Sequence, residues 1–337
     1  MSHSGRGLRV PLFPQKKTIS ETPKQTTTSC SESDHESSFE ETLEEGLCLL
    51  HKIQRSKFPV YLACLKDSKE LCALKIFPYK DSRPHPSFLN EIRFQFLKHP
   101  NIIQMKYYEL HKEMLHKNSY IKVSTIVLEY APYGDLYSFL AKYKAQMGEI
   151  LIRTIFHKIV SGLEYLHTCG IFDFDLKLEN ILIGEDYEIK ICDFDTSLKD
   201  KDMVPLSSGT PNYRPPELSQ GTCKDWRAAD IYMLGVLLFV LKAKGAMPYL
   251  ENQSFKGICL KNLMYNNNEN FWSVHSESLN QGRDFFSQEF RELFNSLISQ
   301  SPDDRPSIET IKRTKWFNEQ IYNQQEYCEE MKRIFGY

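Results

Sequence analysis

The sequence predicts an α+β fold in which a small β-rich lobe with one main helix precedes a larger, mainly helical lobe. Three observations predict it. Short β-rich runs dominate the first third, apolar residues recur at helical spacing through the second half, and 337 residues suffice for two domains or one bilobal unit. With 41% hydrophobic and 26% charged residues, the composition is that of a globular chain with a sizeable core.

Net charge and cysteine usage exclude several classes of function. The 42 basic and 44 acidic residues give a net charge of −2, so no nucleic acid or anionic membrane partner is expected. The nine cysteines are scattered and never form a Cys-x-x-Cys pair, which indicates neither a zinc site nor a disulfide framework. Because no secretory leader is visible, we expect reduced thiols in the cytoplasm, with the nucleus as the alternative.

The small lobe is expected over about residues 42–130, after a polar, Ser- and Thr-rich arm at 1–41 that we expect to be disordered. Residues 60–65 and 71–77 are β-rich runs joined by Lys-Asp-Ser-Lys, which predicts a hairpin. A helical stretch over 88–97 follows.

Two further apolar runs, near 102–110 and 121–129, complete a predicted sheet of five strands.

The larger lobe is expected over about residues 131–317. Apolar positions at helical spacing predict four helices, over 136–143, 149–167, 229–242 and 290–298. The apolar run 232–241 has about half the length needed to cross a bilayer and indicates a buried core helix. The polar tail, 318–337, is expected to be either a helix packed on the larger lobe or an interaction segment.

Polar residues suited to phosphoryl transfer flank a predicted strand pair at 181–183 and 188–192. Transfer from a nucleotide needs a cation on the phosphates, oxygen ligands for Mg²⁺ and a carboxylate aimed at the attacking hydroxyl. Asp-Leu-Lys-Leu-Glu-Asn at 175–180 precedes the strand pair, and Asp-Phe-Asp at 193–195 follows it. This order resembles the catalytic and metal-binding loops of eukaryotic protein kinases.

Other landmarks of that family follow in register from about residue 47 to residue 317. Lys75 in Ala-Leu-Lys-Ile resembles the phosphate-binding lysine, and Glu91, 16 residues later, resembles its ion-pair partner. Val-Leu-Glu-Tyr-Ala at 127–131 resembles the hinge that reads adenine, with Leu128 as gatekeeper.

Residues 209–217, which finish in Pro-Pro-Glu, resemble the end of the activation loop in that family. Asp230 matches the buried acid that anchors the catalytic loop, and Arg305 matches the partner of Glu217. Lys177 and Thr210 are typical of serine/threonine-directed members.

The resemblance implies a bilobal protein-kinase-like domain over 42–317 that transfers the γ-phosphoryl group of ATP to a serine or threonine of a protein substrate. In that reading Asp175 accepts the hydroxyl proton and Lys177 stabilises the γ-phosphoryl group. Mg²⁺ or Mn²⁺ is expected on Asn180 and Asp193. Contacts to the nucleotide are expected from Val60, Lys75, Glu91, Glu129, Ala131 and Asp135.

The loop that covers the nucleotide departs from the family pattern. The family has Gly-x-Gly-x-x-Gly there, so that backbone amides can approach the phosphates. Residues 53–60 contain no glycine, and Pro59 lacks an amide donor. Arg55 and Lys57 are expected either to supply cations to the phosphates or to face water.

The triplet before the catalytic loop is Asp-Phe-Asp at 173–175, where the family has His-Arg-Asp. Loss of the arginine argues against switching by phosphorylation of Ser207 or Ser208. Asp195 replaces a glycine, and we expect it to tolerate the positive φ of that turn. With about three added negative charges near the site, we expect either that ATP binds only at elevated Mg²⁺ or Mn²⁺ or that an added carboxylate serves as an extra metal contact.

Two functions therefore stay open. An active serine/threonine kinase is favoured by the presence of six groups: Lys75, Glu91, Asp175, Lys177, Asn180 and Asp193. The glycine-free loop and altered triplet instead favour a pseudokinase that acts as an interaction scaffold. A small-molecule kinase is a distant third, because residues 209–217 resemble a peptide-docking segment. The sequence identifies neither the protein substrate nor the oligomeric state.

Overall fold

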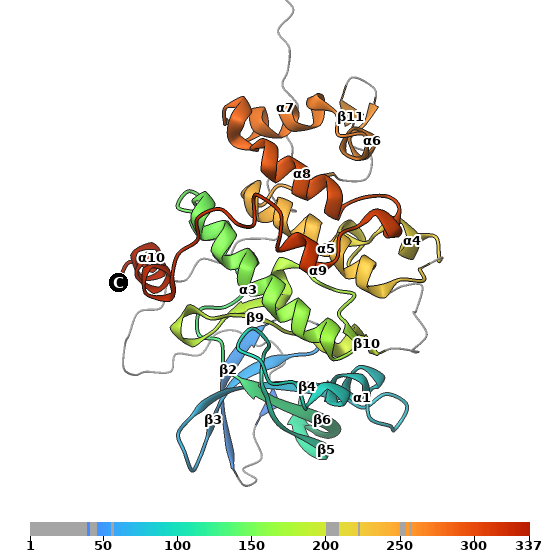
Figure 1. Cartoon of the computed structure of the whole chain (residues 1–337). Coiled ribbons are helices and arrows are strands. Elements are labelled where there is room, and N and C mark those ends of the chain that lie inside the picture. Colours follow the sequence, from blue (N-terminus) through green and yellow to red (C-terminus); the bar gives the residue numbers. More distant parts are fainter. Residues whose placement is uncertain are drawn as a thin grey trace, which may run out of the picture.

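A computed structural model describes residues 39–40, 46–54, 57–199, 209–221, 223–249, 254–255 and 258–337. Figure 1 shows a lobe built on a β-sheet, in blue and teal, and a larger helical lobe formed by described residues that follow it in the sequence. The predicted α+β architecture is confirmed, with the β-rich lobe formed first along the sequence.

The small lobe is one antiparallel sheet with the strand order β1-β5-β6-β4-β3-β2. Its strands are β1 (Phe39–Glu40), β2 (Leu47–Gln54), β3 (Val60–Leu65), β4 (Leu71–Pro78), β5 (Met105–His116) and β6 (Ser119–Glu129). The four strand runs located in the sequence correspond to β3, β4, β5 and β6, although β5 starts and ends later than the predicted 102–110, and β2 supplies the fifth predicted strand. The predicted β3–β4 hairpin is present. The sixth strand, β1, lies within the segment 1–41 that was expected to be a disordered arm, and it pairs with β5. Residues 1–38 of that segment lie outside the described residues.

The helix of the small lobe is α1 (Pro86–Glu91), which continues as the 3₁₀ turn η1 (Ile92–Phe94). Pro86 occupies the first turn, where its missing N–H costs nothing, and the His85 ring accepts a hydrogen bond from the Ser87 N–H. Phe88 and Glu91 are three residues apart and both buried, so one face of α1 packs on the sheet. This face directs Glu91 towards β4.

The larger lobe contains nine α-helices among the described residues. They are α2 (Leu136–Tyr143), α3 (Glu149–Thr168), α4 (Pro216–Ser219), α5 (Trp226–Lys242), α6 (Leu260–Tyr265), α7 (Glu269–Ser278), α8 (Gln288–Leu297), α9 (Ile308–Ile311) and α10 (Gln324–Phe335). The four predicted helices correspond to α2, α3, α5 and α8, with ends that differ from the prediction by three residues at most.

Short strands and 3₁₀ turns connect these helices. The strands are β7 (Ile171–Phe172), β8 (Ile181–Ile183), β9 (Ile189–Ile191), β10 (Leu198–Lys199), β11 (Ser254–Phe255) and β12 (Ile258–Cys259). The 3₁₀ turns are η2 (Leu178–Asn180), η3 (Glu185–Tyr187), η4 (Phe194–Thr196), η5 (Pro211–Tyr213), η6 (Arg283–Phe285) and η7 (Pro302–Asp304). The predicted pair β8–β9 is antiparallel and carries the polar segments at its two ends.

Helix α5 forms the centre of the larger lobe. The apolar run 232–241 is buried throughout, which confirms the predicted core helix. Gly235 lets α8 approach closely, because a Cβ atom there would lie 2.7 Å from Cβ of Leu297. Within the described ranges, no helix combines the length and apolar character that a bilayer crossing requires.

Part of the tail forms a helix packed on the larger lobe, which agrees with the first of the two alternatives for 318–337. Helix α10 starts with a capping box between Asn323 and Glu326. It buries Tyr327, Met331 and Ile334 in the core of the larger lobe.

Candidate active site

A cavity of about 270 Å³ lies between the two lobes and is lined by residues of both. The six residues expected to contact a nucleotide, Val60, Lys75, Glu91, Glu129, Ala131 and Asp135, all line it. Asn180 and Asp193, the expected metal ligands, line it as well. The cleft is therefore open at the position where the sequence places these groups.

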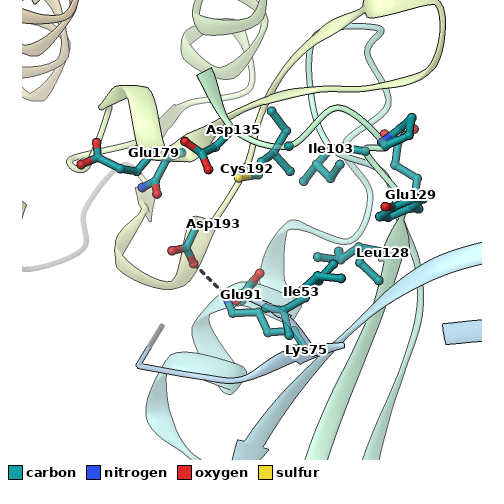
Figure 2. Close-up of a pocket in the computed structure, with 18 residues that line it drawn as sticks. Ile53, Lys75, Glu91, Ile103, Leu128, Glu129, Asp135, Glu179, Cys192 and Asp193 are labelled. Atoms are coloured by element: carbon teal, nitrogen blue, oxygen red, sulfur yellow. Dashed lines mark hydrogen bonds and ion pairs between the residues drawn. The ribbon is translucent and has the colours of Figure 1, made fainter. Parts of the chain in front are cut away.

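Lys75 joins two acids that are far apart in the sequence. Its Nζ lies 2.6 Å from Oε2 of Glu91 on α1 and 2.6 Å from Oδ1 of Asp193 after β9 (Figure 2). Lys75 is on β4 between β3 and β6, so the sheet fixes its backbone. The expected ion pair is present, and it includes the acid of the Asp-Phe-Asp segment.

Burial and charge oppose each other in this triad. Burial alone would lower the pKa of Lys75, but the carboxylates of Asp193 and Glu91 outweigh it and raise that pKa. Burial raises the pKa of Glu91 to about 7, with Lys75 opposing the rise. Burial also disfavours the Asp193 carboxylate, yet the Lys75 ammonium holds its pKa below the usual range. A charged Lys75–Asp193 pair therefore faces the cavity.

Residues 193–197, called the metal loop below, contain one residue in the left-handed region, and it is Asp193 and not Asp195. Asp193 has φ of +71°, in the left-handed region that aspartate tolerates better than most residues. Asp195 lies inside η4 and is absent from the described non-glycine residues with positive φ. The expectation that Asp195 adopts a positive φ is therefore wrong, and its replacement of glycine costs the turn no backbone strain.

Asn90, next to Glu91 on α1, holds the metal loop against the small lobe. Its Nδ2 faces three loop carbonyls, those of Ser197 at 2.8 Å, Asp195 at 3.1 Å and Phe194 at 3.4 Å. Arg93 donates to Oδ1 of Asn90 at 2.8 Å, which fixes which end of the amide faces the loop. Nothing in the sequence motifs singled out Asn90.

Asp175 is oriented by three neighbouring groups. Lys177 Nζ lies 2.5 Å from its Oδ2, Thr210 Oγ1 donates to its Oδ1 at 2.6 Å, and Asn180 Nδ2 donates to Oδ2 at 3.1 Å. Lys177 also donates to Thr210 at 2.9 Å. Burial would lower the pKa of Lys177, but Asp175 raises it overall. Asp175 and Lys177, the expected catalytic pair, are thus in contact with each other and with Thr210 of the segment 209–217.

The backbone before Asp175 is held by Asp230. Its two carboxylate oxygens accept the N–H groups of Asp173 and Phe174, each at 3.0 Å, and one also lies 2.9 Å from Nε2 of His167. Phe174 has φ of +61°, and its carbonyl oxygen would lie 2.4 Å from a Cβ atom at Gly209. Glycine is therefore required at 209.

The Phe174 ring, which stands where the family has arginine, is buried against Trp226. Ser207 and Ser208, the sites considered for phosphorylation, lie outside the described residues.

Asp173 adds less negative charge to the site than its residue type suggests. The side chain is fully buried, and burial followed by the nearby Asp230 raises its pKa well above the ordinary value. Burial and Asp193 also raise the pKa of Asp195. Because both shifts favour the neutral acid, the expected three extra charges overstate the negative field.

Lys57 turns towards the metal loop. Its Nζ lies 3.8 Å from Oδ2 of Asp195 and 3.3 Å from Oγ of Ser87, and its side chain is 66% exposed. Lys57 does not line the cavity. Of the two expectations for this lysine, contact with phosphates is not supported by its position, and Arg55 lies outside the described residues.

Glu217 and Arg305 form the expected buried pair. Two guanidinium nitrogens of Arg305 lie 2.5 and 2.8 Å from the two carboxylate oxygens of Glu217. This bidentate geometry anchors the segment 209–217 to the body of the larger lobe.

The oxygen groups at one end of the cavity fit a hard divalent cation. Asn180 directs its amide nitrogen at Asp175, which leaves the amide oxygen for a cation, and Asp193 uses one carboxylate oxygen for Lys75. Among the described residues no three His, Cys, Asp or Glu side chains are arranged to hold a metal by themselves. Mg²⁺ commonly combines one or two carboxylates with substrate phosphates, and this pair suits that mode.

Several apolar lining residues were not predicted. Ile53, Ala73, Ile103 and Leu182 face the cavity, as does Cys192 before Asp193. The alternation of β8 carries a usable signal, because its outer isoleucines are buried in the core and Leu182 between them points the other way. Ile103 follows no such pattern; its N–H bonds to the carbonyl of Ile191 on β9, a contact between distant segments.

Comparison with known proteins gives a consistent family. A family model described as the protein kinase domain matches residues 56–317. CBL-interacting protein kinase 26 of Oryza sativa subsp. japonica is 32% identical over 228 residues, which cover 66% of this chain and 41% of that protein. CBL-interacting serine/threonine-protein kinase 5 of Arabidopsis thaliana is 28% identical over 260 residues, 73% of this chain and 52% of that protein. The chain spans about half the length of the curated relatives it matches.

Proposed function

The chain belongs to the protein kinase family, and we propose that it transfers the γ-phosphoryl group of ATP to a serine or threonine hydroxyl of a protein. The observation that carries the proposal is the position of Lys75, 2.6 Å from both Glu91 and Asp193 beside an open cavity. A buried cation that is held by two acids and lines a cavity is suited to bind the α- and β-phosphates of a nucleotide.

The hinge side of the cavity would hold the base and ribose. Glu129 and Ala131 follow β6 and would present their backbone to adenine, with Val60 above the ring. Asp135 lines the cavity near the expected ribose, and its carboxylate also caps α2 through the Ser138 N–H at 2.7 Å. The cap holds this acid in place as nucleotide binds.

Asp175 would accept the proton of the attacking hydroxyl. The bond between the substrate oxygen and the γ-phosphorus forms while the bond from that phosphorus to the β–γ bridging oxygen breaks. Lys177, in contact with Asp175, would stabilise the transferring group. Asn180 and Asp193 would hold Mg²⁺, or Mn²⁺ in its place, and the bound cation would neutralise phosphate charge.

The scaffold alternative rests on the glycine-free loop at 53–60 and on the altered triplet at 173–175. An assay of phosphate transfer distinguishes a scaffold from an active enzyme. The full chain is incubated with radiolabelled ATP, Mg²⁺ and a mixed protein substrate, and Asp193→Ala is compared with Asp67→Ala, an exposed residue of the β3–β4 turn. We expect incorporation on serine and threonine that falls about 10²- to 10³-fold in Asp193→Ala and stays unchanged in Asp67→Ala. Equal, negligible incorporation by all three proteins would remove the enzyme and leave the scaffold.

The compartment we propose is the cytoplasm. This rests on cysteine usage, since the eight cysteines in the described ranges are all free thiols. Fractionation of cells that express the tagged chain would test it, and recovery in a secretory compartment would contradict it.

A further inference from the structure

Helix α10 ends in a ring that lies beside the hinge. Phe335 packs among four aromatic side chains of the larger lobe, with ring centroids 4.8 to 5.7 Å away: Tyr133, Tyr143, Phe139 and Tyr187. Tyr133 comes from residues 130–135, called the hinge loop here, which join β6 to α2. The other rings come from α2 and from the turn between β8 and β9. Figure 1 shows α10, in dark red, at the side of the larger lobe away from α8.

Tyr133 connects this aromatic cluster to the nucleotide cavity. Its two chain neighbours, Pro132 and Gly134, both line the cavity. The Tyr133 N–H donates to the carbonyl of Ile183 at 3.2 Å, and the Ile183 N–H donates to the carbonyl of Gly134 at 2.8 Å. Two backbone hydrogen bonds therefore join the hinge loop to β8, which supplies Leu182 to the cavity.

Helix α10 also holds the β8–β9 turn. The buried Tyr327 hydroxyl donates to the Tyr187 carbonyl at 2.9 Å, and the Cys328 thiol lies 3.6 Å from the Asp186 carbonyl. Asp186 and Tyr187 have φ of +50° and +60°, a left-handed conformation that is uncommon for a bulky residue such as tyrosine. The Tyr187 ring in turn stacks on Phe335 at an interplanar angle of 18°.

We propose that Phe335 is a positioning residue for the nucleotide. By filling the recess between the hinge loop and the β8–β9 turn, its ring holds Pro132, Gly134 and Leu182 in the arrangement that shapes the cavity. Phe335 does not itself line the cavity, and α10 lies beyond the residues matched by the kinase domain. The inference rests on the proposed function in one respect, that this cavity binds ATP.

The test compares Phe335→Ala with Lys332→Ala, an exposed residue of the same helix, in the full chain. Hydrogen exchange of the hinge amides, measured without nucleotide, should accelerate in Phe335→Ala only. The dissociation constant of ATP with Mg²⁺, measured by calorimetry, should rise about fivefold or more, as is usual for coupling between sites. In turnover, KM for ATP should rise while kcat at saturating ATP stays near its original value.

Phe335→Tyr keeps the ring, so its hinge exchange and its affinity for ATP should equal those of the unaltered chain. Unchanged hinge exchange, or unchanged ATP affinity, in Phe335→Ala overturns the inference. An equal loss of affinity in Lys332→Ala also overturns it. A chain that binds ATP but transfers no phosphate contradicts the proposed function alone, whereas a chain that binds no ATP contradicts both.

Discussion

Replacing Asp173 with asparagine should stabilise the folded chain, although the residue is buried next to Asp175. No hydrogen-bond partner among the described residues reaches Oδ2 of Asp173, and its Oδ1 has one contact, 3.4 Å from Oγ of Ser197. Burial, then Asp230 and Asp175, raise the pKa of this carboxyl well above its usual range. The folded chain therefore keeps a proton that the unfolded chain releases.

The sign of the pH dependence follows from that difference. As the pH rises above about 3.9, an unfolded aspartate ionises while Asp173 in the folded chain does not, so the free energy of unfolding falls. The fall stops once the folded group also ionises. Asparagine does not titrate and therefore avoids this loss, which is about 1.4 kcal/mol for each pH unit between the unfolded and the folded pKa. We expect Asp173→Asn to gain about 1.4 kcal/mol or more at pH 8 and less at pH 5.

Urea unfolding at several pH values between 5 and 8 measures this gain, and Asp230→Asn is the matched contrast. Asp230 is equally buried but accepts hydrogen bonds from the N–H groups of Asp173 and Phe174 and lies within bonding distance of His167. Its replacement should destabilise the chain by about 1.5–3 kcal/mol. A loss of stability in Asp173→Asn, or a gain that is the same at pH 5 and pH 8, would refute the reasoning.

Three further changes test other parts of the site. Asn90→Leu removes the amide that faces the metal loop carbonyls, and kcat/KM should fall about tenfold for each 1.4 kcal/mol lost; steady-state kinetics equal to those of the unaltered chain would contradict the role of Asn90. At a pH above the raised pKa of Asp195, Asp195→Gly removes a negative charge near Asp193, so ATP should bind at lower Mg²⁺ than in the unaltered chain; thermal-shift titrations that coincide across a magnesium series would count against it. Glu217→Gln leaves the buried Arg305 without its charge partner and should cost about 3–5 kcal/mol in urea unfolding; a cost below about 1 kcal/mol is the opposing result.

The sequence predicted the residues that carry chemistry better than it predicted what holds them. Lys75 and Asp193 are 118 residues apart, and their contact was expected only because the order of motifs resembles a family with a known arrangement. Asn90 belongs to no such motif. It binds the metal-loop carbonyls only because a segment more than 100 residues away folds against α1, and its local sequence does not indicate this contact.

Burial and backbone conformation were also beyond the sequence. The charge of Asp173 depends on neighbours and solvent exclusion that only the packed lobe supplies. The positive φ was expected at Asp195 because a family glycine is missing there, but the turn places its left-handed residue two positions earlier. A local substitution pattern shows which residue type changed and not which residue bears the conformation.

The departures from the family pattern leave the geometry of the site intact for a common reason. At Phe174 the structure needs the backbone, since Asp230 binds its N–H and its carbonyl packs against Gly209, and neither contact uses the side chain. At Asp195 the carbonyl is bound by Asn90, again independently of the side chain. The missing arginine therefore removes a cation that could receive a phosphate, whereas the frame that orients Asp175 and Asp193 depends on contacts which need no phosphate.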